Sequence, residues 1–182
     1  MQNVTLWRAL LGVEDTVIED VEFDEGDEVV VAHVRPRRTR DGRCGVCGVR
    51  ASWYDRGERR RRRWRGLDLG TIEVFLEADS PRVNCPVHGP TVRAVPWARH
   101  AAGHTYAFDQ QVAWLATQCS KSAITQLMRV AWRTVGAIIS RVWAETAATF
   151  DPFAGLRRIG IDEISYKRSL SRFLCKPVGM GG

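Results

Sequence analysis

The chain has 182 residues, of which 45% are hydrophobic and 26% are charged, so it has room for one or two small domains with a buried core. It contains neither an 18-residue apolar run nor a leader-like N-terminus, which argues against a membrane protein and predicts a cytoplasmic location where thiols stay reduced. The net charge of +6 is unevenly spread: residues 14–28 hold nine acids and no base, and residues 35–65 hold thirteen arginines and three acids. This asymmetry is typical of a protein that binds a polyanion.

Residues 1–35 are expected to form a helix followed by a β-hairpin. Apolar side chains recur at helical spacing within residues 4–13. Residues 16–23 and 28–34 are rich in β-branched side chains, and the polar segment between them contains Gly26. The sequence therefore predicts an N-terminal helix and two antiparallel strands.

Residues 36–95 carry two pairs of metal-binding side chains. Cys44 and Cys47 form the first pair, and Cys85 and His88 repeat the same spacing after 37 intervening residues. Together they supply the four ligands that tetrahedral Zn²⁺ prefers, with turn residues beside both pairs. The alternative, buried thiols and a surface histidine, would not need the second pair. Four protein ligands leave no open position, so we predict a structural zinc site.

The densest positive charge lies inside this module. The planar guanidinium group of arginine can bind phosphate oxygens through two hydrogen bonds, so this run of arginines is predicted to contact DNA. The alternative is a solvated charge run that only improves solubility. The arginines concerned are Arg59, Arg60, Arg61, Arg62, Arg63 and Arg65. After them, residues 71–77 alternate apolar and polar side chains and predict a half-buried strand.

Residues 100–150 predict three helices, at 106–118, 121–130 and 134–148, with Ser120 and Thr134 as N-caps of the second and third. The third helix places a stripe of apolar side chains on the face that it is expected to bury: Val135, Ile138, Ile139, Val142 and Trp143. Arg133, Thr134 and Arg141 are the predicted DNA contacts of a helix-turn-helix whose last helix enters the major groove. Periodicity fits a plain helical hairpin equally well.

Residues 155–182 begin with a strand-like pattern that leads into Asp162 and Glu163. A carboxylate at this position could hold Mg²⁺, but a two-metal centre needs several carboxylates that converge on the ions. On its own, Asp162 fits a surface acid better than a metal ligand.

Five motifs occur in order along the chain: Cys44-x-x-Cys47, Trp64-Arg-Gly-Leu-Asp-Leu-Gly70, Cys85-Pro-x-His88, Trp132-Arg-Thr-Val135 and Ile159-Gly-Ile-Asp-Glu-Ile-Ser-Tyr-Lys167. This ordered set resembles the ISL-three family of bacterial insertion-sequence transposases over about residues 35–168. The resemblance implies a zinc-binding domain, a helix-turn-helix that binds terminal inverted repeats, and the start of a ribonuclease-H-like catalytic domain. It also implies that Asp162 is the first acid of an Asp-Asp-Glu triad that holds Mg²⁺ in full-length members.

The sequence after Lys167 departs from the family, because its 15 residues contain no Asp or Glu. We therefore expect an α+β fold: a small β-rich zinc-binding module, an all-α helix-turn-helix domain, and an incomplete ribonuclease-H-like strand. The expected function is that of a truncated transposase, associated with the nucleoid, which binds double-stranded DNA and does not catalyse transposition alone. Its expected protein partners are a second copy or a full-length transposase. The alternatives are a stand-alone zinc-containing DNA-binding regulator and a zinc-stabilised protein-interaction module.

Overall fold

The computed structural model describes residues 4–55, 61–151, 154–155 and 157. Its elements, in chain order, are α1 (Val4–Leu11), β1 (Thr16–Asp24), β2 (Val29–Pro36), β3 (Ser52–Trp53), β4 (Arg61–Arg65), β5 (Glu73–Asp79), β6 (Arg82–Cys85), β7 (Gly89–Val92), α2 (Tyr106–Gln118), α3 (Lys121–Leu127) and α4 (Trp132–Thr149). A first compact unit ends at Val142, inside α4, and the contacts described below lie within that unit. In the described part of the chain, no helix is both long and apolar enough to cross a membrane.

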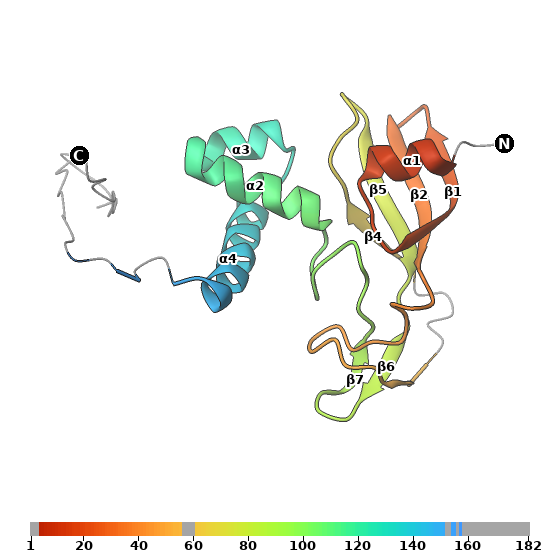
Figure 1. Cartoon of the computed structure of the whole chain (residues 1–182). Coiled ribbons are helices and arrows are strands. Elements are labelled where there is room, and N and C mark those ends of the chain that lie inside the picture. The colour runs from red at the N-terminus through yellow and green to blue at the C-terminus, as the bar shows by residue number, and fades with distance from the viewer. Residues whose placement is uncertain (1–3, 56–60, 152–153, 156, 158–182) are drawn as a thin grey trace. The chain divides into compact units, whose positions relative to one another are not determined.

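The main sheet has the strand order β1-β2-β5-β4 (Figure 1). β1 and β2 form the predicted antiparallel hairpin, whereas β2 pairs with β5 in parallel and β5 pairs with β4 antiparallel. The hairpin from residues 1–35 therefore shares one sheet with strands from residues 36–95, so the expected boundary at residue 35 does not separate two folded units. Each strand directs alternate side chains to one face, as the pleat requires.

One face of this sheet is the main hydrophobic core. Val30, Ala32, Val74 and Leu76 are buried there, and Trp64 of β4 packs edge-on against Trp97 with ring centroids 5.4 Å apart. The helix α1 lies over this face through Trp7 and Leu11 (Figure 1). Because Trp64 is 1% exposed, it anchors the arginine-rich segment to the core and is not free to stack on a base.

The opposite face of the sheet holds a buried carboxylate. Glu77 lies between His33 of β2 and Arg63 of β4, its cross-strand neighbours in the register. Its oxygens lie 2.6 Å from Nε of Arg63 and 3.1 Å from Nε of Arg61. Burial alone would raise the pKa of Glu77, but the hydrogen bond from Arg63 and the charge of Arg61 outweigh it and lower the pKa. Two arginines of the basic run are thus paired within the fold.

Three helices form the second hydrophobic core. Thr105 caps α2, and Ser120 caps α3 as predicted: its hydroxyl accepts from the amide of Ala123. The core consists of Phe108, Val112, Leu115, Ile124, Met128, Val135 and Ile138.

Two expectations for the third helix are wrong. α4 begins at Trp132, so Thr134 lies in its first turn and is not the N-cap. Trp143, expected on the buried stripe, is 53% exposed, because the helical core extends along α4 only to Val142.

A buried acid joins the helices to the segment that precedes them. Asp109, in the first turn of α2, is fully buried and lies 3.3 Å from Arg99 and 3.4 Å from Arg141 of α4. The His104 ring stacks on Phe108, and its Nδ1 is 3.9 Å from Asp109. Burial, together with the charges of Arg141 and Arg65, lowers the pKa of His104. The fold therefore favours neutral His104.

The fold confirms the expected α+β class and the three-helix domain. The expected ribonuclease-H-like strand and Asp162 lie outside the described residues.

We expect Glu77→Gln to lower the free energy of unfolding by about 1–2 kcal/mol, because it removes the charge that Arg61 and Arg63 share while those arginines remain half exposed. Urea unfolding at neutral pH measures this change. Glu19→Gln is the control, since its pair with Arg35 is exposed on both sides. Equal stability of the two variants would contradict a structural role for Glu77.

Stability should also depend on His104 below neutral pH. The unfolded chain binds a proton at His104 near pH 6.5, whereas the folded chain, whose His104 pKa is lowered, binds it only at lower pH. The contribution of neutral His104 to the free energy of unfolding is therefore fully present above pH 6.5. It is lost as the pH falls from that value through the lower pKa of His104 in the folded chain. Thermal unfolding between pH 7.5 and 5.5 should show a smaller loss for His104→Gln than for the parent chain. The same loss in both would rule out this contribution.

Candidate metal centre and DNA-binding helices

Two tight turns bring the four predicted metal ligands together. In the first turn, the amide of Gly48 donates to the carbonyl of Cys44, and Gly48 adopts a φ of 71°. Gly89, which follows the second pair, has a φ of 64°. These backbone conformations favour glycine. One ligand atom each from Cys44, Cys47, Cys85 and His88 lies within 4.8 Å of all the others.

The separations match the edges of a tetrahedron around zinc. Zn–S bonds of about 2.3 Å and Zn–N bonds of about 2.0 Å imply S···S edges of about 3.8 Å and S···N edges of about 3.5 Å. The Cys47 and Cys85 sulfurs are 3.7 Å apart. Nδ1 of His88 lies 3.7 Å from the Cys44 sulfur and 3.6 Å from that of Cys85. The four side chains therefore fit a tetrahedral dication.

Backbone amides prepare part of this site for a positive ion. The amide of His88, followed by that of Val87, lowers the pKa of Cys85 to about 6 and so favours the thiolate that a metal requires. At Cys47 the amide of Val49 acts in the same direction, but desolvation and the sulfurs of Cys44 and Cys85 outweigh it and raise the pKa. A bound dication would lower the pKa of both thiols.

The segment around these ligands has little core of its own. Its sheet has the order β3-β6-β7, and its buried cluster consists only of Cys44, Val83 and Cys85, with Ala51 at the margin. So few buried side chains do not stabilise a fold, so a metal held by the four ligands would be the main cross-link between the turns. We call this segment, residues 43–55 and 82–93, the ribbon.

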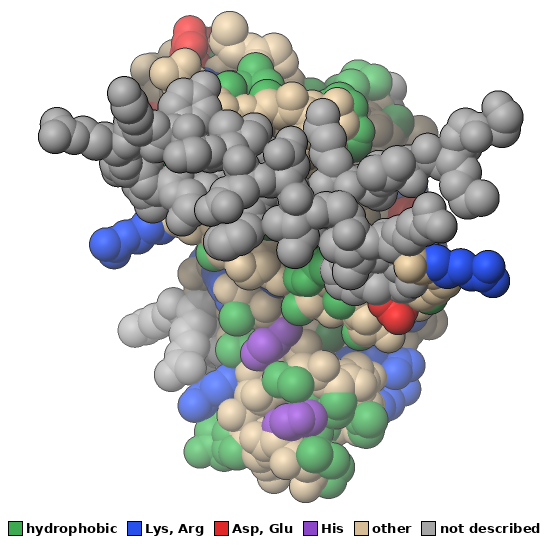
Figure 2. Space-filling view, turned by 90° about the vertical axis from the view of Figure 1, so that its left-hand side faces the viewer, with side chains coloured by type: hydrophobic (Ala, Val, Ile, Leu, Met, Phe, Trp, Pro, Cys, Tyr) green, Lys and Arg blue, Asp and Glu red, His purple; other side chains and the backbone are tan. Residues whose placement is uncertain are grey.

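Apolar side chains project from the tip of the ribbon. Val46, Val49 and Val87, which lie within or beside the two ligand pairs, are 52%, 49% and 74% exposed. Figure 2 shows hydrophobic and histidine side chains at this lower end of the molecule, with Lys and Arg side chains beside them. These valines form an exposed apolar patch with basic side chains beside it.

The outer face of α4 is small and basic. Arg133, Ala137 and Ser140 are exposed, and Thr134 is partly exposed. At position 136, a Cβ would lie 3.0 Å from Nζ of Lys121, which stacks on the Trp132 ring at 4.3 Å. This face of α4 is narrow enough to enter a groove.

The turn between α3 and α4 closes without glycine. The amide of Val130 donates to the carbonyl of Thr125 at 3.2 Å. This hydrogen bond has the six-to-one spacing of a Schellman motif. Arg129 occupies the left-handed position of this motif with a φ of 51°. A Cβ in that conformation costs roughly 1–2 kcal/mol.

The predicted DNA contacts in the basic run have different environments. Arg59 and Arg60 lie outside the described residues. Arg61 and Arg63 pair with Glu77, whereas Arg62 projects from the other face of β4, stacks on Trp64 and donates to the carbonyl of Ala102.

Two further predicted contacts face protein carboxylates. Arg65 is 8% exposed and pairs with Asp68 and Glu73, so its burial argues against a DNA contact. Arg141 is partly buried beside Asp109 and is oriented toward the helical core. Among the described arginines of the basic run, Arg61 and Arg63 are exposed but paired with Glu77, whereas Arg62 is only partly exposed and pairs with no carboxylate in the described part of the chain. On α4, Arg133 is exposed.

Sequence patterns predicted no separate role for Asp68 or Arg129, which form an ion pair although they lie 61 residues apart. An arginine in a turn where glycine is usual is the only local signal, and it does not identify the partner.

Comparisons with known proteins agree with this division of the chain. Residues 31–88 match the zinc-finger of transposase IS204/IS1001/IS1096/IS1165, and residues 93–143 match the helix-turn-helix domain of transposase family ISL3. The transposases for insertion sequence element IS1557 from two strains of Mycobacterium tuberculosis are each 68% identical over 92% of this chain. The chain spans 39% of the length of these relatives. No solved structure matches it.

Loss of the metal should unfold the ribbon and spare the main sheet. We expect Cys47→Ala, or a chelator, to abolish amide protection at Cys44 and Gly48, whereas Val74 and Leu76 keep it because their core is separate. Hydrogen exchange with elemental analysis of zinc measures both effects. Cys119→Ala is the control, since this exposed thiol lies outside the cluster. Unchanged protection in Cys47→Ala would contradict the metal assignment.

Proposed function

Because the chain belongs to transposase family ISL3, we propose that it binds duplex DNA at the terminal inverted repeats of an insertion sequence. The observation that carries this proposal is the exposed face of α4, where Arg133, Ala137 and Ser140 present one basic and two small side chains. In a helix-turn-helix, this face of the last helix reads base edges in the major groove.

The roles of individual residues follow from their surroundings. Arg133 contacts base edges, with Thr134 beside it, and Arg62 contacts phosphate. Arg141 acts indirectly, because Asp109 holds it against the helical core. Arg59 and Arg60 remain predicted phosphate contacts.

In this proposal Zn²⁺ is bound by Cys44, Cys47, Cys85 and His88 and has a structural role. Four protein ligands would fill its coordination sphere, so the ion orders the ribbon and leaves no position for a reacting group. The tetrahedral separations and the small ribbon core support this assignment.

Strand transfer is a property that we do not assign to this chain. Asp162 matches the first acid of the catalytic triad only by its motif, and its role with Mg²⁺ stays a prediction. DNA binding is therefore the activity to test first.

The apolar ribbon tip supports a second candidate, a zinc-stabilised module that binds protein. Val46, Val49 and Val87 form an exposed patch of the kind that protein partners cover. This alternative predicts DNA binding that is weak and independent of sequence.

We expect Arg133→Gln to weaken binding to the correct repeat by about 1–3 kcal/mol and to leave binding to a scrambled duplex nearly unchanged. Fluorescence anisotropy with both duplexes, using the ends of the IS1557 element as the repeat, measures the difference at several salt concentrations. Arg62→Gln should weaken binding to both duplexes and flatten the salt dependence.

Arg35→Gln is the control for loss of one positive charge, because Arg35 is exposed and pairs with Glu19 on the hairpin. Equal affinity of the parent chain for repeat and scrambled duplexes would reject specific recognition. Equal effects of Arg133→Gln and Arg35→Gln would reject the role of Arg133.

A further inference from the structure

The backbone of Arg129 adopts a left-handed conformation that favours glycine. It has a positive φ in the turn between α3 and α4, where the Schellman bond from Val130 to Thr125 closes the helix. Glycine would satisfy this turn without a strained Cβ. A side chain held on this strained backbone points to a use for it.

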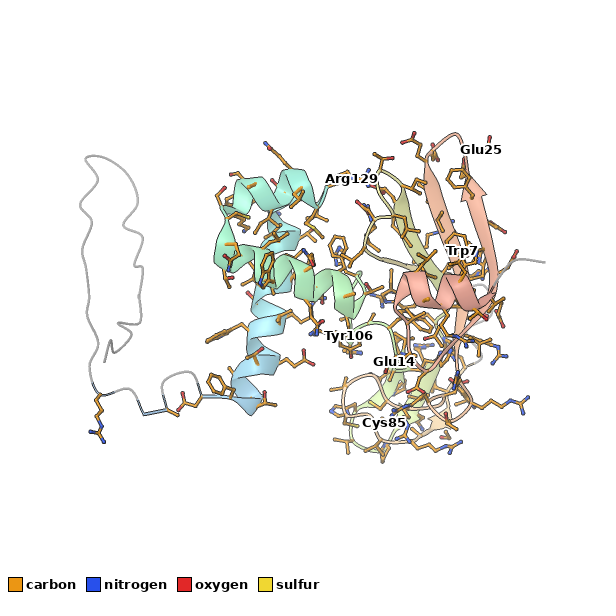
Figure 3. All side chains as sticks on the ribbon, turned by 45° about the horizontal axis from the view of Figure 1, so that its top comes forward. Trp7, Glu14, Glu25, Cys85, Tyr106 and Arg129 are labelled. Atoms are coloured by element: carbon orange, nitrogen blue, oxygen red, sulfur yellow. The ribbon has the colours of Figure 1, made fainter. Side chains whose placement is uncertain are left out.

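That side chain joins the helix-turn-helix to the main sheet. Nε and a terminal nitrogen of Arg129 lie 3.2 Å and 2.5 Å from the same oxygen of Asp68, in the segment between β4 and β5. Figure 3 shows Arg129 at the end of α3, on the side of the helices nearest to the strands. The hydrogen bond from Arg129 to Asp68 is also the main reason that the pKa of Arg129 is raised.

Asp68 is itself held rigidly. Its other oxygen accepts from the buried Arg65 at 2.5 Å, and Arg65 also pairs with Glu73 at 2.7 Å. Glu73 in turn lies 3.8 Å from Nε of Arg129. Each arginine therefore faces both acids, and each acid faces both arginines. Such an alternating network resists displacement of one member, because every movement separates two opposite charges.

We propose that the Arg129–Asp68 pair fixes the orientation of the helix-turn-helix on the main sheet, and thereby sets the spacing between two DNA contacts, one made by α4 and one by the sheet and ribbon. This inference rests on the proposed DNA-binding function. Asp68 and Arg129 are positioning residues and do not themselves touch DNA.

Fixed orientation has a definite consequence for recognition. Two contacts joined by a flexible linker tolerate many separations on DNA, whereas two contacts held rigidly bind well only when the separation and the helical phase match. The DNA site is therefore a duplex with two sequence blocks at one spacing.

The test uses Arg129→Gly in the full chain. Glycine suits the backbone of the turn, so this variant removes the ion pair and keeps the fold of α3 and α4. Asp15→Asn is the control for loss of an ion pair elsewhere in the chain, because Oδ2 of Asp15 lies 2.7 Å from Nε of Arg40. Asp68→Asn tests the other partner.

Binding sites are first selected from a random duplex library with the parent chain, and affinities are then measured for duplexes whose two blocks are moved apart by half a helical turn, about 5 bp. We expect this insertion to weaken binding by the parent chain and by Asp15→Asn about tenfold. Arg129→Gly and Asp68→Asn should bind the selected site about tenfold more weakly and lose the preference for spacing.

Residual dipolar couplings measure the orientation without DNA. In the parent chain, the main sheet and the three helices should share one alignment tensor, and in Arg129→Gly the two tensors should differ. A shared tensor in Arg129→Gly, or a retained preference for spacing, would overturn the proposal. If the parent chain selects a single sequence block, the spacing role falls and DNA binding stands. If it selects none, the proposed function falls.

Discussion

A buried guanidinium group needs opposite charges and hydrogen-bond acceptors to replace the water that it loses. Arg65 is such a group, and its partners connect several segments of this molecule. Its charge is matched by Asp68 and Glu73, its plane lies over the Phe75 ring, and its backbone bonds to Gly103 and Thr105. These partners come from β5, from the segment before it and from the segment before α2. A buried charge of this kind is costly when any partner is lost, so it specifies one arrangement of these segments.

The ribbon contains the four predicted metal ligands but almost no hydrophobic core. In the proposed zinc-bound form its order depends on the ion, whereas the main sheet and the helices each have a hydrophobic cluster. That form combines parts stabilised by burial with one part stabilised by coordination. The parts differ in what disturbs them: chelators act on the ribbon, and loss of apolar contacts acts on the rest.

The sequence predicted what depends on local pattern and failed where partners are distant. The bounds of α2 and the capping role of Ser120 were correct, because periodicity and side-chain capping are local. The arginine run was visible as charge, but its pairing with Glu77 depends on strand register, which composition does not contain. The predictions that Thr134 caps α4 and that Trp143 is buried were wrong, because the start of α4 and the extent of the helical core depend on packing. Arg129 was missed because the usual signal for its conformation is glycine.

The parallel pairing of β2 with β5 has a consequence for how the chain folds as it is made. Val29 pairs with Glu73, 44 positions later in the chain, and residues 37–72, which include the first cysteine pair and all of β4, separate the two strands. A nascent hairpin of β1 and β2 must therefore keep the edge of β2 unpaired until β5 has been synthesised. Contacts so distant in sequence are slow to form, and the exposed hairpin is open to wrong pairing during that interval. The acidic side chains along β1 and its turn give the waiting hairpin a charge that disfavours association with another copy.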